Sequence, residues 1–255
     1  MRWVVFNQKG GVGKSTIVCN LAAVSARAGR RTLVVDLDAQ ANASHYVLGS
    51  DVEAADPNLA QFFEQTLGFR LFRGGAKGFV HHTRFDNLHI MPCDAGLEDL
   101  QAKLEAKYKI YKLRDALDEL DEYDEIFLDT PPAFNFYTLS ALIAGDRCLV
   151  PFDCDDFSRR ALYNLLESVD EVREDHNSKL EVGGIVVNQF QARARLPQLL
   201  VDGLVNEGLP ILEPFISASV KVRESHGASK PLPYLARSHK LTRQFEELFS
   251  TIQRL

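Results

Sequence analysis

Short apolar segments rich in β-branched residues alternate along the chain with longer segments whose apolar positions recur at helical spacing. The short segments are typical of buried parallel strands and cover residues 3–6, 32–36, 88–92, 125–129, 147–151, 182–187 and 211–215. The helical spacing covers residues 14–28, 157–174, 197–207 and 240–253. Strands joined by crossover helices predict an α/β fold: a mostly parallel, twisted sheet of about seven to eight strands with helices on both faces.

Two stretches fit this alternation less well. Glycines at 74, 75 and 78 interrupt any period in residues 51–87, where we expect loop and short helix. Residues 95–124 are rich in charge with leucines at helical spacing, which predicts a pair of solvated amphipathic helices. No repeat or linker divides the chain, so we expect a single domain over residues 1–255.

Composition narrows the functional classes. The 255 residues are 45% hydrophobic and 25% charged, as in an average globular protein, and the net charge of -6 supplies no general field for polyanions. Any contact with nucleic acid must therefore come from a local basic patch. No signal peptide and no apolar run of 18 or more residues occurs, so we expect a cytoplasmic protein that does not span a membrane. The cysteines form no C-x-x-C pair, which argues against zinc or an iron-sulfur cluster: Cys19, Cys93, Cys148 and Cys154.

A glycine-rich turn follows the first predicted strand directly. Residues 9–16 read K-G-G-V-G-K-S-T and lead straight into a helical pattern, which is the setting of a phosphate-binding P-loop. Glycines let backbone N–H groups approach phosphates closely, and the positive end of the following helix favours the same anion. Lys14 is placed to neutralise the β and γ phosphates, and the Ser15 hydroxyl to complete a Mg²⁺ shell.

The turn departs from the general P-loop consensus because Gln8 stands where that consensus has glycine. With a second lysine at Lys9, the form K-G-G-x-G-K-[ST] resembles the deviant Walker A motif of the ParA/MinD superfamily. Three further segments are similar to motifs of that family. They are V-D-L-D-A-Q-A-N at residues 35–42, the Walker B-like E-I-F-L-D-T-P-P at 125–132, and C-L-V-P-F-D-C at 148–154.

The resemblance implies an ATPase that uses ATP and Mg²⁺. The residues implied in nucleotide binding are Lys9, Gly10, Gly11, Val12, Gly13, Lys14, Ser15, Thr16 and, at the adenine, Asn188. Asp38 is implied as the residue that orients or deprotonates the attacking water, Asp129 as a Mg²⁺ residue acting through a water, and Asp36 as support for the metal shell. Each carboxylate has an alternative role as a strand-end or helix-capping aspartate.

The resemblance also implies a nucleotide-dependent homodimer. In the family, the lysine matching Lys9 reaches across a two-fold interface to the phosphates of the other subunit. Thr130 and Pro131 match switch II, which senses the same phosphate. ATP therefore stabilises the pair, with Lys9, Lys14 and Asp38 in catalytic roles, and we expect slow hydrolysis that a partner protein accelerates.

A segment near the carboxyl terminus favours the ParA/Soj type. Residues 216–231 read I-S-A-S-V-K-V-R-E-S-H-G-A-S-K-P and resemble a ParA segment, although Ser217 stands where the family usually has proline. Basic residues in and near this segment contact DNA phosphates in that family. The matching candidates are Arg193, Arg195, Lys221 and Arg223. Because the P-loop begins by residue 9, we expect no amino-terminal helix-turn-helix, and DNA binding that is non-specific.

The function implied is partition of a plasmid or chromosome, or positioning of a protein cargo, over the nucleoid with a ParB-like or cargo-adaptor activator. Two alternatives stay open. A MinD-like membrane-cycling ATPase ends in a basic amphipathic helix, whereas residues 245–255, F-E-E-L-F-S-T-I-Q-R-L, suit a core-packed helix better. A metabolic ATP-dependent ligase is possible because one fold hosts many chemistries.

Overall fold

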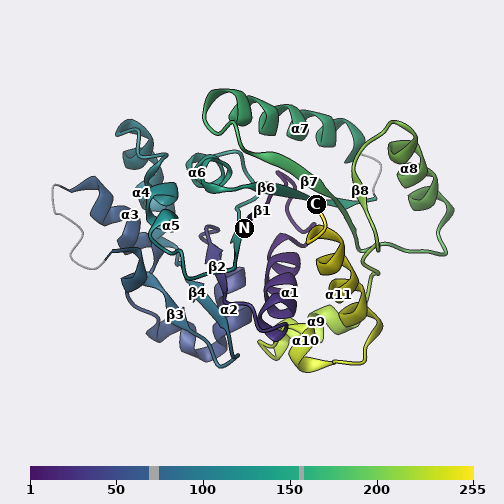
Figure 1. Cartoon of the computed structure of the whole chain (residues 1–255), viewed down its shortest axis with the longest axis horizontal. Coiled ribbons are helices and arrows are strands. Elements are labelled where there is room, and N and C mark those ends of the chain that lie inside the picture. Colours follow the sequence, from purple (N-terminus) through teal and green to yellow (C-terminus); the bar gives the residue numbers. More distant parts are fainter. Residues whose placement is uncertain (69–74, 155–157) are drawn as a thin grey trace.

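One eight-stranded sheet runs through the computed structural model, which describes residues 1–68, 75–154 and 158–255 (Figure 1). The strands lie in the order β3-β4-β2-β5-β1-β6-β7-β8. All neighbours pair in parallel except β3, which is antiparallel to β4. The strands are β1 Arg2–Val5, β2 Thr32–Asp36, β3 His81–His82, β4 Leu88–Met91, β5 Glu125–Asp129, β6 Arg147–Asp153, β7 Glu181–Asn188 and β8 Ile211–Leu212. The predicted α/β architecture is therefore confirmed.

Helices cover both faces of this sheet (Figure 1). They are α1 Lys14–Arg27, α2 Asn42–Leu48, α3 Leu59–Leu67, α4 Gly96–Ala106, α5 Lys112–Asp118, α6 Phe136–Ala144, α7 Ser158–Asp175, α8 Arg195–Asn206, α9 Val220–Gly227, α10 Leu232–Leu235 and α11 Lys240–Ile252, with 3₁₀ turns at Gly49–Ala54 and Ala76–Phe79. Across the three described ranges, no helix combines the length and apolar character needed to cross a membrane.

Alternate residues of the central strand β1 enter two separate cores. Val4 packs in the core that α3 to α7 cover, whereas Trp3 and Val5 pack in the core that α1, α2 and α11 cover. Successive side chains of a strand point to opposite faces, so a strand covered on both faces must be apolar at nearly every position. This requirement produces the continuous apolar segments that made the strands recognisable in the sequence.

The observed elements differ from the predicted ones mainly at their ends. Strand β8 stops at Leu212 instead of residue 215, since Pro214 has no N–H to donate to a ladder. The prediction missed β3, which has only two residues, and the short helices α2, α6, α9 and α10. Helix α7 is described from Ser158, so its predicted start at residue 157 lies outside the described residues, as does Gly74.

Candidate nucleotide-binding site

The polar candidates gather where the central parallel strands end. Asp36 on β2 pairs in register with Asp129 on β5, and Asp129 is also the register partner of Val5, the last residue of β1. On the other side of β1, Asp153 and Asn188 end β6 and β7 as register partners. The loop that follows β1 is thus flanked by strand ends carrying carboxylates and amides, the usual position of ligands in open α/β sheets.

The glycines of this loop have a steric explanation. Gly11 and Gly13 have φ angles of 77° and 90°, which side-chain-bearing residues rarely adopt. A Cβ at Gly13 would lie 2.3 Å from Nδ2 of Asn188, whereas a Cβ at Gly10 would meet nothing within 4 Å. Gly13 is also the residue before α1, and its carbonyl accepts the Ile17 N–H at 2.9 Å. The loop therefore delivers the chain into a helix amino terminus directly at the strand ends.

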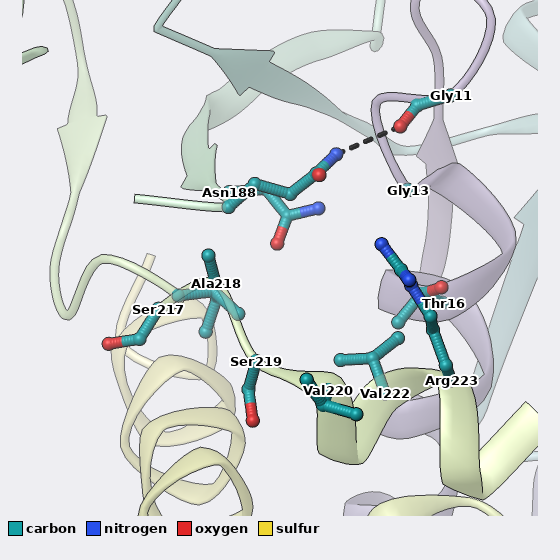
Figure 2. A pocket seen from close by; sticks show the side chains of 12 residues that line it. Gly11, Gly13, Thr16, Asn188, Ser217, Ala218, Ser219, Val220, Val222 and Arg223 are labelled. Carbon is teal, nitrogen blue, oxygen red and sulfur yellow. Dashed lines mark hydrogen bonds between the residues drawn. The ribbon is translucent and has the colours of Figure 1, made fainter. Parts of the chain in front are cut away.

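Side chains at the end of β7 hold the loop in place. Asn188 donates from Nδ2 to the Val12 carbonyl at 2.8 Å. Gln189 donates from Nε2 to the Gly11 carbonyl at 2.9 Å, and the dashed line to Gly11 in Figure 2 marks this bond. Asn188 therefore lies beside the P-loop and contacts it through Nδ2, whereas its contact with the adenine stays a prediction. Gln189 was missed by the sequence analysis, since a lone glutamine gives no signal of a loop contact.

The two lysines of the motif occupy different surroundings. Lys14 is buried, and its Nζ donates to the Lys9 carbonyl at 3.1 Å. Burial lowers the pKa of Lys14, and the charges of Asp129 and Asp38 oppose that change. The Lys9 side chain is 43% exposed, with its Nζ 3.8 Å from a carboxylate oxygen of Asp153. One lysine thus lies inside the glycine turn, and the other lies at the surface.

Asp36 is a buried carboxylate with a full set of hydrogen bonds. Its Oδ2 accepts from the backbone N–H and the hydroxyl of Ser44 at 2.8 and 2.7 Å, and its Oδ1 accepts from the Asp38 N–H at 3.2 Å. Burial raises the pKa of Asp36 to about 6, although the bonds from Ser44 oppose the rise. Asp36 therefore fixes the backbone that carries Asp38. Ser44 was missed because nothing in the sequence predicted α2.

Asp129 is buried equally deeply but has no comparable partners. Within the described residues, neither carboxylate oxygen of Asp129 has a hydrogen-bond partner. Burial, together with the charge of Asp36, raises the pKa of Asp129 well above its usual range, while the nearby Ser15 hydroxyl and Lys14 ammonium oppose the rise. A buried carboxylate without donors is costly unless a cation compensates it, so Asp129 and the Ser15 hydroxyl fit an oxygen-liganded divalent ion.

Asp38 and Thr130 follow the ends of β2 and β5. Asp38 is 8% exposed, and its Oδ1 accepts the Gln40 N–H at 3.1 Å. Thr130 is fully buried and donates its hydroxyl to the Val5 carbonyl at 2.8 Å, which ties the start of the predicted switch II segment to β1. Pro131 follows and is buried. The geometry thus places the predicted switch residue against the strand that leads into the P-loop.

The four basic candidates do not share one environment. Arg193 and Arg195 are exposed around the start of α8, and Lys221 on α9 is paired with Glu224 at 2.5 Å. Arg223 instead lines a cavity of about 480 Å³ beside the glycine loop (Figure 2). Arg223 is exposed like Arg193 and Arg195, so its role as a DNA contact stays a prediction.

A glycine turn on a strand end, a buried lysine within it and buried aspartates on the adjacent strands define a P-loop nucleotide-binding protein of the deviant Walker type. Residues 2–182 match the protein family described as AAA domain. The chain is 33% identical over 234 residues to the chromosome partitioning protein ParA of Myxococcus xanthus, covering 89% of this chain and 79% of that protein. It is also 33% identical to the chromosome-partitioning ATPase Soj of Thermus thermophilus, covering 99% and 96%. The chain therefore belongs to the ParA/MinD-type family of P-loop ATPases.

A solved structure shares the fold over nearly the full length. The cobyrinic acid a,c-diamide synthase of Mycobacterium smegmatis, crystallised with ADP and magnesium, superposes with a TM-score of 0.83. The alignment covers 99% of this chain and 94% of that one, at 24% identity. Such a likeness shows a common fold, which proteins with different chemistries share.

Proposed function

We propose that this protein is an ATP-dependent dimerising switch that binds DNA non-specifically as an ATP sandwich dimer and partitions a plasmid or chromosome, or positions a protein cargo. The observation that carries the proposal is the pair of lysines on one glycine turn, with Lys14 inside the site and Lys9 at the surface. The similarity to ParA and Soj proteins supports the same function.

Mg²⁺ and ATP are the cofactors of the proposed site. The Ser15 hydroxyl and Asp129 would hold the ion, Asp129 through a water, with Asp36 supporting the shell from behind. Bound Mg²⁺ supplies charge neutralisation on the phosphates. The unpartnered oxygens of Asp129 support this assignment, because hard oxygen ligands are those that Mg²⁺ prefers.

The other residues of the proposed site have distinct roles in ATP hydrolysis. Lys14 binds the β and γ phosphates, and Asp38 orients or deprotonates the attacking water. Thr130 and Pro131 respond to loss of the γ-phosphate, and the anchoring of Thr130 on β1 gives that response a short path to the P-loop. Turnover is slow in the isolated protein, and a ParB-like or cargo-adaptor protein accelerates it.

Dimerisation and DNA binding follow from the surface lysine and the basic residues. Lys9 reaches the phosphates of the second subunit, so the γ-phosphate is the anion that both subunits require. Exposed Arg193 and Arg195, with Lys221, contact DNA phosphates in the dimer and associate the cytoplasmic protein with the nucleoid. Such contacts release counterions, so binding falls steeply as salt rises.

An electrophoretic mobility shift with a non-specific duplex tests the proposal. Retardation is expected with ATP and Mg²⁺, not with ADP, and a rise from 50 to 200 mM salt is expected to weaken it strongly. The double variant Arg193→Ala/Arg195→Ala should lose most of the retardation while still binding ATP. Retardation that is independent of ATP, or none at all, would contradict the DNA-binding proposal.

Two further assays on the same purified protein test the two alternative functions, a membrane-cycling ATPase and a metabolic ligase. ATP-dependent sedimentation with anionic vesicles, without DNA retardation, indicates a MinD-like membrane-cycling ATPase. Turnover that requires an added small molecule, such as a carboxylic acid with an amine donor, indicates a metabolic ligase. The chain's similarity in fold to a diamide synthase makes the second control necessary.

A further inference from the structure

Helix α9 brings a cation to the wall of the cavity beside the P-loop. The helix begins after Ser219, whose side chain accepts the Lys221 N–H. Among the described residues that line the cavity, Arg223 alone carries a positive charge, and none carries a negative one. The rest of the lining comes from Gly11, Gly13, Thr16, Asn188, Gln189 and residues 216–220 and 222.

Contacts one turn further along fix α9 against the helix that follows the P-loop. His226 Nε2 lies 2.9 Å from the hydroxyl of Thr16, and the His226 ring stacks on Tyr46 with centroids 3.8 Å apart. Tyr46 in turn shares a hydrogen bond of 2.7 Å with Ser225. Arg223 precedes His226 by three residues and so lies on the same face of α9. The packing therefore directs Arg223 toward the P-loop.

Arg223 is exposed, and its guanidinium group forms no hydrogen bond or ion pair with any of the described residues. Figure 2 shows its nitrogen atoms beside Thr16, directed toward the space between Gly13 and Asn188. Lys221, two residues earlier, by contrast forms an ion pair with Glu224. An uncompensated arginine opposite an anion-binding turn is an arrangement suited to a phosphate group.

We propose that Arg223 binds the α-phosphate of the nucleotide from the wall opposite the P-loop and is not a DNA contact. The inference rests on the proposed nucleotide site. The apolar lining around Arg223, from Ile216, Ala218 and Val222, suits the base of the same ligand. Because ATP and ADP share the α-phosphate, Arg223 contributes to the binding of both, unlike a residue that senses the γ-phosphate.

Isothermal titration calorimetry with Mg²⁺ and ATP, ADP or adenosine tests this assignment. The variant Arg223→Ala should bind ATP and ADP about tenfold more weakly, with a similar factor for each, while its affinity for adenosine stays at the wild-type value. Arg223→Lys should recover part of the loss, since it keeps the charge but not the planar fork. Arg237→Ala, which removes an exposed arginine outside the cavity, should bind all three ligands as wild type does.

Unchanged ATP and ADP affinity in Arg223→Ala would overturn the proposal, as would an equal loss for adenosine, which would place the contact at the base. Lost DNA retardation at saturating ATP, with unchanged nucleotide affinity, would overturn it in favour of a DNA contact. If wild type never retards DNA but Arg223→Ala weakens ADP binding, the DNA function fails and this assignment stands. Unchanged circular dichroism and thermal unfolding of Arg223→Ala show that the variant folds.

Discussion

At the residue scale, two aspartates on neighbouring strands have identical side chains but different hydrogen-bonding surroundings. Asp36 receives three hydrogen bonds, whereas Asp129, its register partner, receives none among the described residues. Burial raises the pKa of both carboxyl groups. The unpartnered carboxylate of Asp129 thus lowers the stability of the folded protein but can bind a cation. Such a trade-off between stability and function is frequent at functional sites.

Replacing Asp129 by asparagine should stabilise the nucleotide-free, metal-free protein at pH 8 by about 1–3 kcal/mol and abolish Mg²⁺-dependent ATP hydrolysis. The unfolded aspartate titrates near 3.8 and the folded one well above, so wild type loses stability as pH rises through that interval. Asp129→Asn removes this loss. The free energy of unfolding of the variant should therefore exceed that of wild type by less at pH 5 than at pH 8.

Urea unfolding at the two pH values measures the difference, with the exposed surface variant Asp121→Asn as control. A destabilised Asp129→Asn protein, or a variant with wild-type hydrolysis, would contradict the assignment of Asp129.

Gly13→Ala should weaken nucleotide binding through backbone strain and a steric clash with the Asn188 side chain. The residue has a φ of 90°, and its new Cβ would lie 2.3 Å from Asn188. A left-handed alanine costs about 1–2 kcal/mol, and the loop must also shift out of the cradle. Fluorescent ADP should bind at least about tenfold more weakly. Gly10→Ala, which meets nothing within 4 Å, is the matched control and should keep the fold and most of the affinity.

At the scale of elements, the short helix α2 positions the segment that carries Asp38. Ser44, near its start, donates its hydroxyl to Asp36 and accepts the Cys93 N–H at 3.2 Å. Asp36 in turn holds the Asp38 N–H. A chain of hydrogen bonds therefore joins α2, the end of β2 and the segment after β4, and the position of Asp38 depends on all three elements.

Ser44→Ala should destabilise the protein by about 1–3 kcal/mol, because it leaves two buried groups with one partner fewer. The loss of the hydroxyl bond should also raise the pKa of Asp36 further and slow ATP hydrolysis more than it weakens ATP binding. Thermal unfolding and phosphate release measure the two effects. Ser50→Ala, at an exposed serine of the following 3₁₀ turn, should change neither. Wild-type stability and turnover in Ser44→Ala would refute the positioning role.

At the scale of the whole molecule, the P-loop lysines divide between nucleotide binding and assembly. Lys9→Ala should still bind ADP but fail to self-associate with ATP, because the side chain that reaches the second subunit is absent. Sedimentation velocity with and without ATP measures the association, and the exposed Lys179→Ala is the control for loss of one positive charge. Should Lys9→Ala dimerise with ATP as wild type does, the sandwich dimer would be wrong and the protein an ordinary nucleotide binder.

The sequence by itself determined the sheet, the P-loop and the family. Buried parallel strands must be apolar on both faces, and a phosphate turn needs glycines and lysines at fixed spacing, so both features are local and can be recognised without coordinates. Strand β3 and helices α2, α6, α9 and α10 were missed because short elements are stabilised by packing more than by their own sequence.

Only the tertiary structure decided what each side chain faces. It distinguished the hydrogen-bonded Asp36 from the unpartnered Asp129, although both are strand-end aspartates in family motifs. It also placed Arg223 in the wall beside the P-loop, about 210 residues away along the chain, while Lys221 is paired with Glu224. Burial and partners depend on which distant segments pack together, and that information is not contained in the spacing of neighbouring residues.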